Sequence, residues 1–151
     1  MRIGWLVLAL LFFVLGCNSS GDGGIATVGV STVGLIALGA EIKKDNGGDV
    51  IEINLTGQPV GNSDLAQIAQ HTKLQKLWLS RTGVTDIGLI ELQSMKRLRV
   101  LGLARTGITD AGLKYLAAIK SLREVYVFPT KVTDGAVDEL KAALPGVRVI
   151  Y

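Results

Sequence analysis

The sequence is short of the residues from which catalytic and metal sites are usually built. It has one cysteine, Cys17, and one histidine, His71. A lone cysteine has no partner for an intramolecular disulfide, and no second histidine or cysteine completes a zinc site. Neither a P-loop nor a G-x-S-x-G motif occurs in the sequence. We therefore expect no enzymatic activity, no metal and no cofactor. We expect His71 to be an ordinary histidine at a helix end, either partly buried or facing solvent.

The chain also lacks a strong excess of either charge. It carries 16 basic and 13 acidic residues, and removal of residues 1–16 would leave fifteen basic residues against thirteen acidic ones. Binding to nucleic acid, or to a membrane through a polybasic patch, usually goes with a larger excess of positive charge. We therefore expect no nucleic-acid partner and no membrane contact that depends on charge.

The main hydrophobic run lies at the N-terminus, where Arg2 is followed by an uncharged segment from Ile3 to Gly16. A short positive segment, a short apolar core and small residues at its end are typical of a secretory signal. The run is also shorter than the roughly 20 residues of a permanent membrane-spanning helix. Residues 1–16 are therefore predicted to be a signal peptide.

The end of this run, Val14-Leu15-Gly16-Cys17, resembles the lipobox of bacterial lipoproteins. The resemblance implies cleavage before Cys17 and lipid attachment to that cysteine, so that an exported protein is anchored to a membrane on its periplasmic or cell-surface side. Residues 17–24, rich in glycine and small polar residues, would form a flexible tether. Asn18 does not supply the aspartate that often marks inner-membrane retention, which slightly favours the outer membrane. The alternative is an ordinary signal peptide followed by an incidental cysteine.

A 24-residue repeat runs through most of the remaining chain. Rows begin at positions 50, 74, 98 and 122, and the residues RTGVTDIGL at 81–89 recur as RTGITDAGL at 105–113. Leu77 and Leu79 have the spacing of a strand, whereas Leu89 and Leu92 have the spacing of a helix. This period and the L-x-x-L-x-L pattern indicate leucine-rich repeats. We predict an α/β solenoid of about four repeats over residues 50–151, with short parallel strands on its concave face and helices on its convex face.

The row pattern T-x-[IV]-T-D-x-G-L resembles the leucine-rich repeats of internalin-like bacterial surface and secreted proteins. It is also similar to the repeats of F-box-type adaptor proteins, without their repeated cysteine. In those families the repeats are recognition scaffolds. The resemblance therefore implies a module that binds another protein.

Both ends of such a solenoid need closing, because an exposed edge strand invites pairing with another chain. Residues 25–49 are predicted to form an N-terminal cap, in which Ser31 caps a short helix over 32–38. The sequence AEIKKD at 40–45 then predicts a strand, and DNGG at 45–48 predicts a turn. At the other end, LPGVRVIY predicts a turn and a closing strand.

An aspartate recurs before each apolar helical segment, which would line up three carboxylates in a stack. This arrangement raises the possibility of a metal site, but Asp before a helix is also a preferred N-cap. The first row has Asn at the equivalent position, which is a good cap and a weaker ligand. We therefore predict helix-capping roles for Asn62, Asp86, Asp110 and Asp134. Thr82, Thr106 and Thr130 are predicted to bond to the backbone in the turns.

The concave face is the candidate binding surface, and its outward side chains follow from strand alternation. The rows align Glu52, Lys76, Val100 and Glu124 in one line, Asn54, Trp78, Gly102 and Tyr126 in a second, and Thr56, Ser80, Ala104 and Phe128 in a third. Trp78 and Tyr126 would stand two strand spacings apart, roughly 9.6 Å. Because Gly102 between them has no side chain, we expect an open slot walled by two aromatic rings. Arg81 and Arg105 would lie at the ends of neighbouring strands.

Aromatic residues and arginine are enriched in binding hot spots. The predicted ligand-binding residues of the concave face are Lys76, Trp78, Arg81, Gly102, Arg105, Glu124, Tyr126 and Phe128. One interpretation is a membrane-anchored module that binds a protein partner of the bacterial envelope. The alternative is a lipoprotein that binds carbohydrate or peptidoglycan in the aromatic slot. A third possibility is that the two rings merely cover the sheet.

Overall fold

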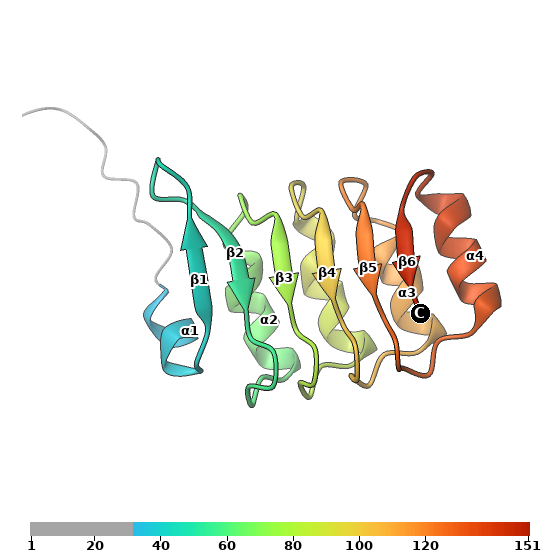
Figure 1. Ribbon diagram of the computed structural model, residues 1–151, viewed down its shortest axis with the longest axis horizontal. Coiled ribbons are helices and arrows are strands. Elements are labelled where there is room, and N and C mark those ends of the chain that lie inside the picture. The colour runs from blue at the N-terminus through green and yellow to red at the C-terminus, as the bar shows by residue number, and fades with distance from the viewer. Residues whose placement is uncertain (1–31) are drawn as a thin grey trace, which may run out of the picture.

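The computed structural model describes residues 32–151, which form a mixed α/β fold around one six-stranded sheet (Figure 1). The strands lie in sequence order, and they are β1 (Glu41–Lys44), β2 (Val50–Asn54), β3 (Lys76–Trp78), β4 (Val100–Gly102), β5 (Glu124–Tyr126) and β6 (Arg148–Ile150). β1 pairs antiparallel with β2, and every later pair is parallel. A parallel connection needs a crossover, which a helical segment supplies between consecutive strands from β2 to β6.

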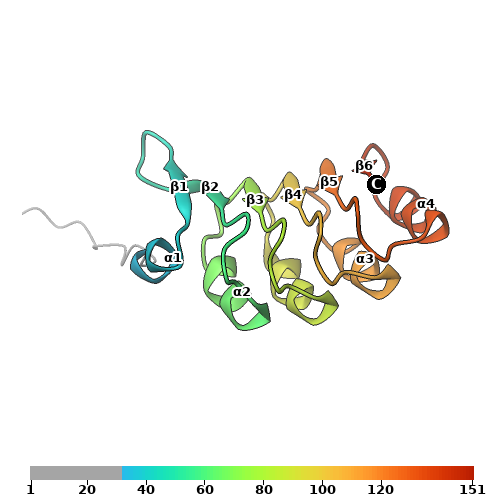
Figure 2. The same cartoon turned by 60° about the horizontal axis from the view of Figure 1, so that its bottom comes forward.

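The helices cover one face of the sheet and leave the other face open (Figure 2). They are α1 (Val33–Ala37), α2 (Asn62–Ala69), the 3₁₀-helix η1 (Asp86–Ser94), α3 (Asp110–Leu116) and α4 (Asp134–Ala143). From α2 onward, each helix packs against the next one along the chain.

The predicted strand register is confirmed. Trp78 pairs with Gly102 and Gly102 with Tyr126, so residues 24 positions apart lie side by side on neighbouring strands. One-residue errors in register would have turned the leucines to the open face, because side chains alternate between the two faces of a strand.

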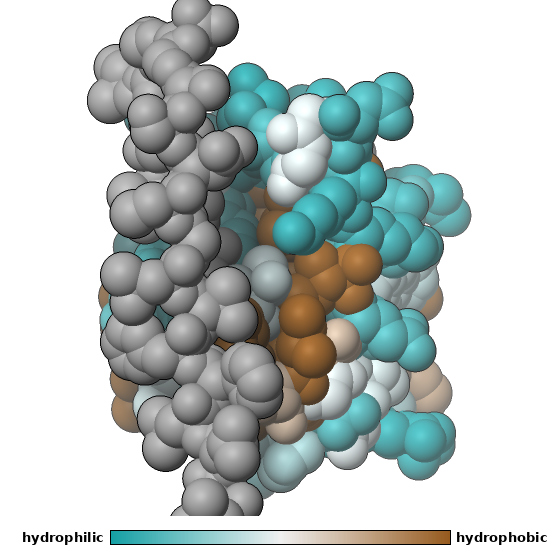
Figure 3. Space-filling view, turned by 90° about the vertical axis from the view of Figure 1, so that its left-hand side faces the viewer, coloured by the Kyte–Doolittle hydropathy of each residue, from teal (hydrophilic) through white to brown (hydrophobic). Residues whose placement is uncertain are grey.

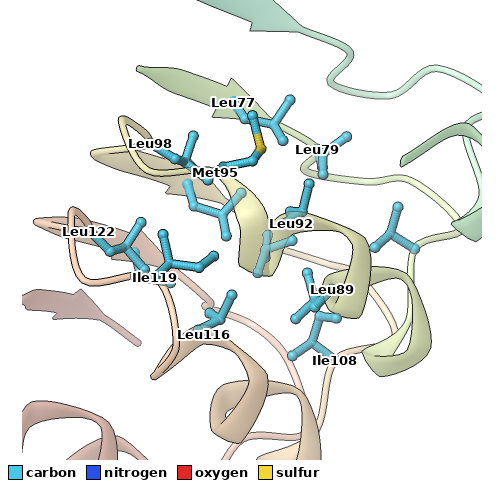
Figure 4. Packing of buried hydrophobic residues seen from close by; sticks show 14 of the residues in the cluster. Leu77, Leu79, Leu89, Leu92, Met95, Leu98, Ile108, Leu116, Ile119 and Leu122 are labelled. Carbon is cyan, nitrogen blue, oxygen red and sulfur yellow. The ribbon is translucent and has the colours of Figure 1, made fainter. Parts of the chain in front are cut away.

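The core fills the space between the sheet and the helices. Leu77 and Leu79 extend from the β3 segment toward Leu89 and Leu92 of η1, and all four side chains are fully buried (Figure 4). Burial of a leucine side chain stabilises a fold by about 1.5–3 kcal/mol relative to exposure. The same positions in the neighbouring rows are also buried, so one continuous apolar layer runs behind the sheet.

The N-terminal end is covered by α1 and the β1–β2 hairpin. Leu35 of α1 is fully buried against the core, whereas Ile36 is 58% exposed. Figure 3 shows that hydrophobic side chains reach the surface at this end of the molecule. The predicted turn is confirmed, since Asp45 Oδ1 accepts hydrogen bonds from the backbone N–H groups of Gly47 and Asp49. The signal peptide, Cys17, the tether and cap residues 25–31 lie outside the described residues. The N-cap of α1 is Thr32, so the prediction that Ser31 caps this helix is wrong.

The helix-capping prediction for Asn62, Asp86, Asp110 and Asp134 is wrong. Each is the first residue inside its helix, and the N-cap is the residue before it. In α3 and α4 that N-cap is a threonine. The hydroxyl oxygen of Thr109 accepts a hydrogen bond from the backbone N–H of Ala111 (3.3 Å), and that of Thr133 accepts one from Ala136 (3.4 Å).

The side chains of Asn62, Asp86 and Asp110 instead bind the following unit, 23 residues further along. Asp86 Oδ1 accepts a hydrogen bond from the backbone N–H of Thr109 (2.8 Å), and Asp86 Oδ2 accepts one from the Thr109 hydroxyl (2.6 Å). Asp110 makes the same two contacts with Thr133. We call these paired contacts, together with the one from Asn62, the threonine clasps.

The clasp from Asn62 differs in the direction of one hydrogen bond. Asn62 Oδ1 accepts from the backbone N–H of Thr85 (2.9 Å), so its amide nitrogen is left to donate to the Thr85 hydroxyl (2.8 Å). The Thr85 hydroxyl makes no cap bond to its own helix, and that helix, η1, is a 3₁₀-helix. Ile87 and Ile90 add β-branched side chains, which favour the α-helix less than unbranched ones.

Candidate functional site

The open face of the sheet carries the side chains that the strand alternation predicts. Glu52, Lys76 and Glu124 lie at one level of neighbouring strands, and Trp78 and Tyr126 lie at the next level. Leu77 and Val125, between these levels, point into the core and are fully buried. Five of the predicted ligand-binding residues therefore lie together on the open face. They are Lys76, Trp78, Gly102, Glu124 and Tyr126.

The open slot between Trp78 and Tyr126 is not present. The two ring centroids are 5.4 Å apart with an interplanar angle of 47°, so the rings touch in a tilted arrangement. The indole leans over Gly102, where an added Cβ would lie 2.5 Å from Cε3 of Trp78. Tilted aromatic contacts at this separation are favourable. The rings therefore close the space that Gly102 leaves, and the expected separation of two strand spacings is wrong.

Each ring also donates a hydrogen bond to a carboxylate, from β2 in the case of Trp78 and from its own strand, β5, in the case of Tyr126. Trp78 Nε1 donates to Glu52 Oε1 (3.2 Å), and the other oxygen of Glu52 is paired with Lys43 Nζ (3.2 Å). The Tyr126 hydroxyl donates to Glu124 Oε2 (3.1 Å), and Glu124 Oε1 is paired with an Arg148 nitrogen from β6 (3.4 Å). The result is a row across the sheet, which we call the open-face array and which consists of Lys43, Glu52, Trp78, Tyr126, Glu124 and Arg148.

The surroundings of Glu52 and Tyr126 shift the pKa values of both groups in opposite directions. Burial acts to raise the pKa of Glu52, but hydrogen bonds from Lys43 and Trp78, with the charges of Lys43 and Lys76, hold it below its ordinary value. The hydrogen bond to Glu124, with burial and the Glu124 charge, raises the pKa of Tyr126. At neutral pH the array therefore presents an ionised Glu52 and a protonated Tyr126 hydroxyl.

Arg81, Arg105 and Phe128 lie beyond the ends of the strands, outside the array. The two arginines have positive φ angles, 59° and 57°, and the first row has Gly57 at the same position with a φ of 75°. Both are exposed, and Phe128 is 66% exposed. The left-handed conformation costs a non-glycine residue about 1–2 kcal/mol. The two arginines occupy equivalent turn positions after β3 and β4, and the sequence pattern alone did not indicate their left-handed backbone.

The turn threonines behave as predicted in two of three rows. The Thr82 hydroxyl donates to the Leu79 carbonyl and the Thr106 hydroxyl donates to the Leu103 carbonyl, both at 2.6 Å. Thr130 follows Pro129 and makes no equivalent bond among residues 32–151.

His71 is buried, with 6% of its surface exposed. Burial, and secondly the charge of Lys44, lower the pKa of its imidazole. Within the described part of the chain its Nε2 atom has no hydrogen-bond partner. His71 also borders a cavity of about 400 Å³ next to Lys44 and Asp49. The residue occupies the position that Met95 and Ile119 fill in later rows, and both of those are buried.

Between residues 32 and 151 no group of three or more His, Cys, Asp or Glu side chains is placed to hold a metal ion. In the same part of the chain, the helices are too short or too polar to cross a membrane.

No protein-family model and no curated protein matches the sequence. Solved structures do match. The actin-binding site 2 region of leiomodin-1 aligns with a TM-score of 0.51 and 16% identity, over 66% of this chain and 68% of that one. At this identity the likeness concerns the fold alone, which is of the leucine-rich-repeat type.

Two further structures align over smaller shares of their own length. The complex of PEPR1 with AtPEP1 gives a TM-score of 0.44 and 17% identity, over 72% of this chain and 19% of that one. An internalin from Listeria monocytogenes strain 4b F2365 gives 0.41 and 15%, over 58% and 31%. This chain therefore spans about a fifth of the first and about a third of the second.

Proposed function

We propose that the protein is a leucine-rich-repeat solenoid of about four repeats that serves as a protein–protein interaction module and has no enzymatic activity of its own. Its partner binds the open face of the sheet, opposite the helices. The observation that carries this proposal is the open-face array. Two aromatic rings in contact lie at its centre, and each is flanked by a carboxylate with its own cation.

The array has the make-up of a binding hot spot on a rigid support. Tryptophan, tyrosine and arginine dominate the energetics of protein interfaces, and strands hold side chains more precisely than loops do. The six strands span about 24 Å at a spacing of about 4.8 Å. This is a surface for a protein or an extended peptide, because the touching rings leave no slot for a small molecule.

We propose further that the module is exported and anchored by lipid on Cys17, in the outer membrane if the host has two membranes. The support is the lipobox resemblance of residues 14–17. Labelled palmitate should be incorporated into the wild-type protein and not into the Cys17→Ser variant. No incorporation into the wild type would remove the anchor from the proposal while leaving the binding face untouched.

The binding proposal is tested by crosslinking from one chosen position of the open face. A photoreactive residue replaces Lys76, which is exposed on the open face, and the matched control replaces Lys114, which is exposed on α3. The proposal expects one defined protein adduct in the intact envelope from position 76 and none from position 114. Adducts of equal yield from both positions, or a cell-wall glycan adduct from position 76, would contradict a protein partner on the open face.

A further inference from the structure

Basic residues are concentrated at the N-terminal ends of the neighbouring strands β3, β4 and β5. The segments that enter these strands read KLQK at 73–76, KRLR at 96–99 and KSLR at 120–123. They hold seven of the sixteen basic residues and no acidic residue, although charge over the whole chain is nearly balanced. This concentration of positive charge therefore arises from the 24-residue period, which repeats a basic segment before each of the three strands.

The backbone brings the three segments side by side. The N–H of Arg99 donates to the carbonyl of Gln75, and the N–H of Arg123 donates to the carbonyl of Arg99, both at 2.8 Å. Gln75, Arg99 and Arg123 thus occupy equivalent positions on consecutive units, about one strand spacing of 4.8 Å apart. Arg99 and Arg123 therefore stand next to each other, directly before β4 and β5, and both side chains line one pocket.

A pocket of about 230 Å³ lies between these segments, and we call it the basic pocket. It is lined by Gln75, Lys96, Arg97, Arg99, Ser121 and Arg123. Four of the six side chains are cations and none is a carboxylate. Within residues 32–151 the salt bridges involve Lys43, Lys73 and Arg148, so no cation of the pocket is neutralised by an acidic side chain.

One side of the pocket is preorganised. The Arg123 guanidinium donates from Nη1 to the carbonyls of Lys120 (3.1 Å) and Leu122 (2.8 Å), which fixes it against the loop. The Ser121 hydroxyl donates to the Leu98 carbonyl (2.7 Å), so this hydroxyl proton is not available to an anion in the pocket. An anion in the pocket would therefore be bound by the guanidinium and ammonium groups and by the Gln75 amide.

Like charges placed together repel one another, and the repulsion is relieved when an anion binds between them. A guanidinium presents N–H groups in a planar fork that matches the oxygens of a phosphoryl group, which it binds with two parallel hydrogen bonds. Arg99 and Arg123 present two such forks from neighbouring strands, with Arg97 and Lys96 beside them.

We propose that the basic pocket is a binding site for a phosphoryl group. The site is separate from the open-face array and does not depend on the proposed protein partner. The phosphoryl group can come from a free phosphomonoester or from the phosphodiester headgroup of an anionic phospholipid.

The test is calorimetric titration of the full chain in non-ionic detergent, at low ionic strength and without phosphate buffer. Inorganic pyrophosphate is the first probe. We expect saturable binding, at least about tenfold weaker in the Arg99→Gln/Arg123→Gln double variant. The matched control, Lys114→Gln/Lys131→Gln, removes two exposed positive charges outside the pocket and should bind as the wild type does. No saturable binding, or equal weakening in both double variants, would overturn the proposal.

Two further probes distinguish the source of the phosphoryl group. Glycerol 1-phosphate represents a free phosphomonoester, and glycerophosphoglycerol represents the headgroup of phosphatidylglycerol. Tighter binding of the monoester indicates a soluble ligand, and tighter binding of the diester indicates a lipid headgroup. Each outcome supports the site, provided that the Arg99→Gln/Arg123→Gln variant loses the binding and the lysine control keeps it.

Discussion

At the scale of single residues, Gly102 determines the shape of the open face. It lies between Trp78 and Tyr126 on the middle strand, and its lack of a side chain lets the indole lean across β4 to the tyrosine. A larger residue there would separate the rings and break the continuous aromatic surface at the centre of the array.

The Gly102→Ala variant should therefore be destabilised. Its Cβ would meet Trp78 Cε3 at 2.5 Å, so the ring must move, and overpacking of this kind costs about 1–3 kcal/mol. Urea unfolding measures the loss, and tryptophan fluorescence reports the altered ring contact. Gly135→Ala is the control, since a Cβ added there would lie 4.0 Å from Thr133 Oγ1, and this variant should be neutral or up to about 1 kcal/mol more stable. Wild-type stability and fluorescence for Gly102→Ala would contradict the packing.

His71 is the second residue whose environment predicts a measurable effect. Because burial lowers the pKa of its imidazole, the folded protein binds the proton less readily than the unfolded chain, whose histidine pKa is about 6.5. This contribution to stability is complete above that pH and is lost as the pH falls below it.

We expect the free energy of unfolding to decrease from about pH 7.5 to about pH 5.5, and to decrease less in the His71→Met variant. Methionine is the residue that the next row carries at this position, where Met95 is buried. Denaturant unfolding at a series of pH values gives both curves. Parallel curves for the wild type and the variant would show that His71 is not the group responsible.

At the scale of helices and strands, the threonine clasps explain why Asp recurs at the start of the helices. Each clasp joins one helix start to the next, so that neighbouring units are tied by hydrogen bonds as well as by the apolar core. Asp134 makes no such contact with a threonine among residues 32–151, and its side chain is exposed. If the aspartates act through the threonine clasps, removing the Asp134 side chain should have little effect on stability. If they act as helix caps, its removal should cost as much as the removal of Asp86.

Asp86→Ala should lower the free energy of unfolding by about 2 kcal/mol, because the half-buried N–H of Thr109 loses its acceptor. Asp134→Ala is the matched control at the same helix position and should change stability by no more than about 0.5 kcal/mol. Thermal or urea unfolding of the two variants decides the matter. Equal losses of stability in the two variants would show that both aspartates act as helix caps and that the clasp contributes nothing measurable.

Asn62→Asp should stabilise the protein by about 0.5–1 kcal/mol. A carboxylate at position 62 accepts from both the N–H and the hydroxyl of Thr85, so the hydroxyl oxygen is free to cap η1, as Thr109 caps α3. The change is measured by urea unfolding, with helical content followed by circular dichroism. A loss of stability would show that the Asn amide makes a contact that a carboxylate does not replace.

At the scale of the whole molecule, the pairing of the strands could be predicted because one periodic pattern fixes it. The offset of 24 residues aligned Trp78, Gly102 and Tyr126, and leucine alternation fixed which face is buried. The contact between the rings could not be predicted, since strand spacing sets the positions of Cα atoms and leaves the side-chain rotamers open.

The clasps and the basic pocket escaped prediction for a different reason. Asp at a helix start satisfies the capping pattern within its own row, whereas its true partner, Thr109 for Asp86, lies in the next row. Net charge likewise averages over the chain and hides a local excess, such as the one at Arg99 and Arg123. Interactions between rows become visible only when the rows are stacked.

The proposed recognition surface is the open face, centred on Trp78. The decisive measurement is the affinity of the captured protein partner for the Trp78→Ala variant, at a temperature where that variant is folded. The expected result is a loss of at least about 2 kcal/mol, roughly thirtyfold, as for an interface hot spot. Tyr151→Ala, which removes a ring that lies over Lys141 of α4, should bind normally. Wild-type affinity of Trp78→Ala would contradict the claim.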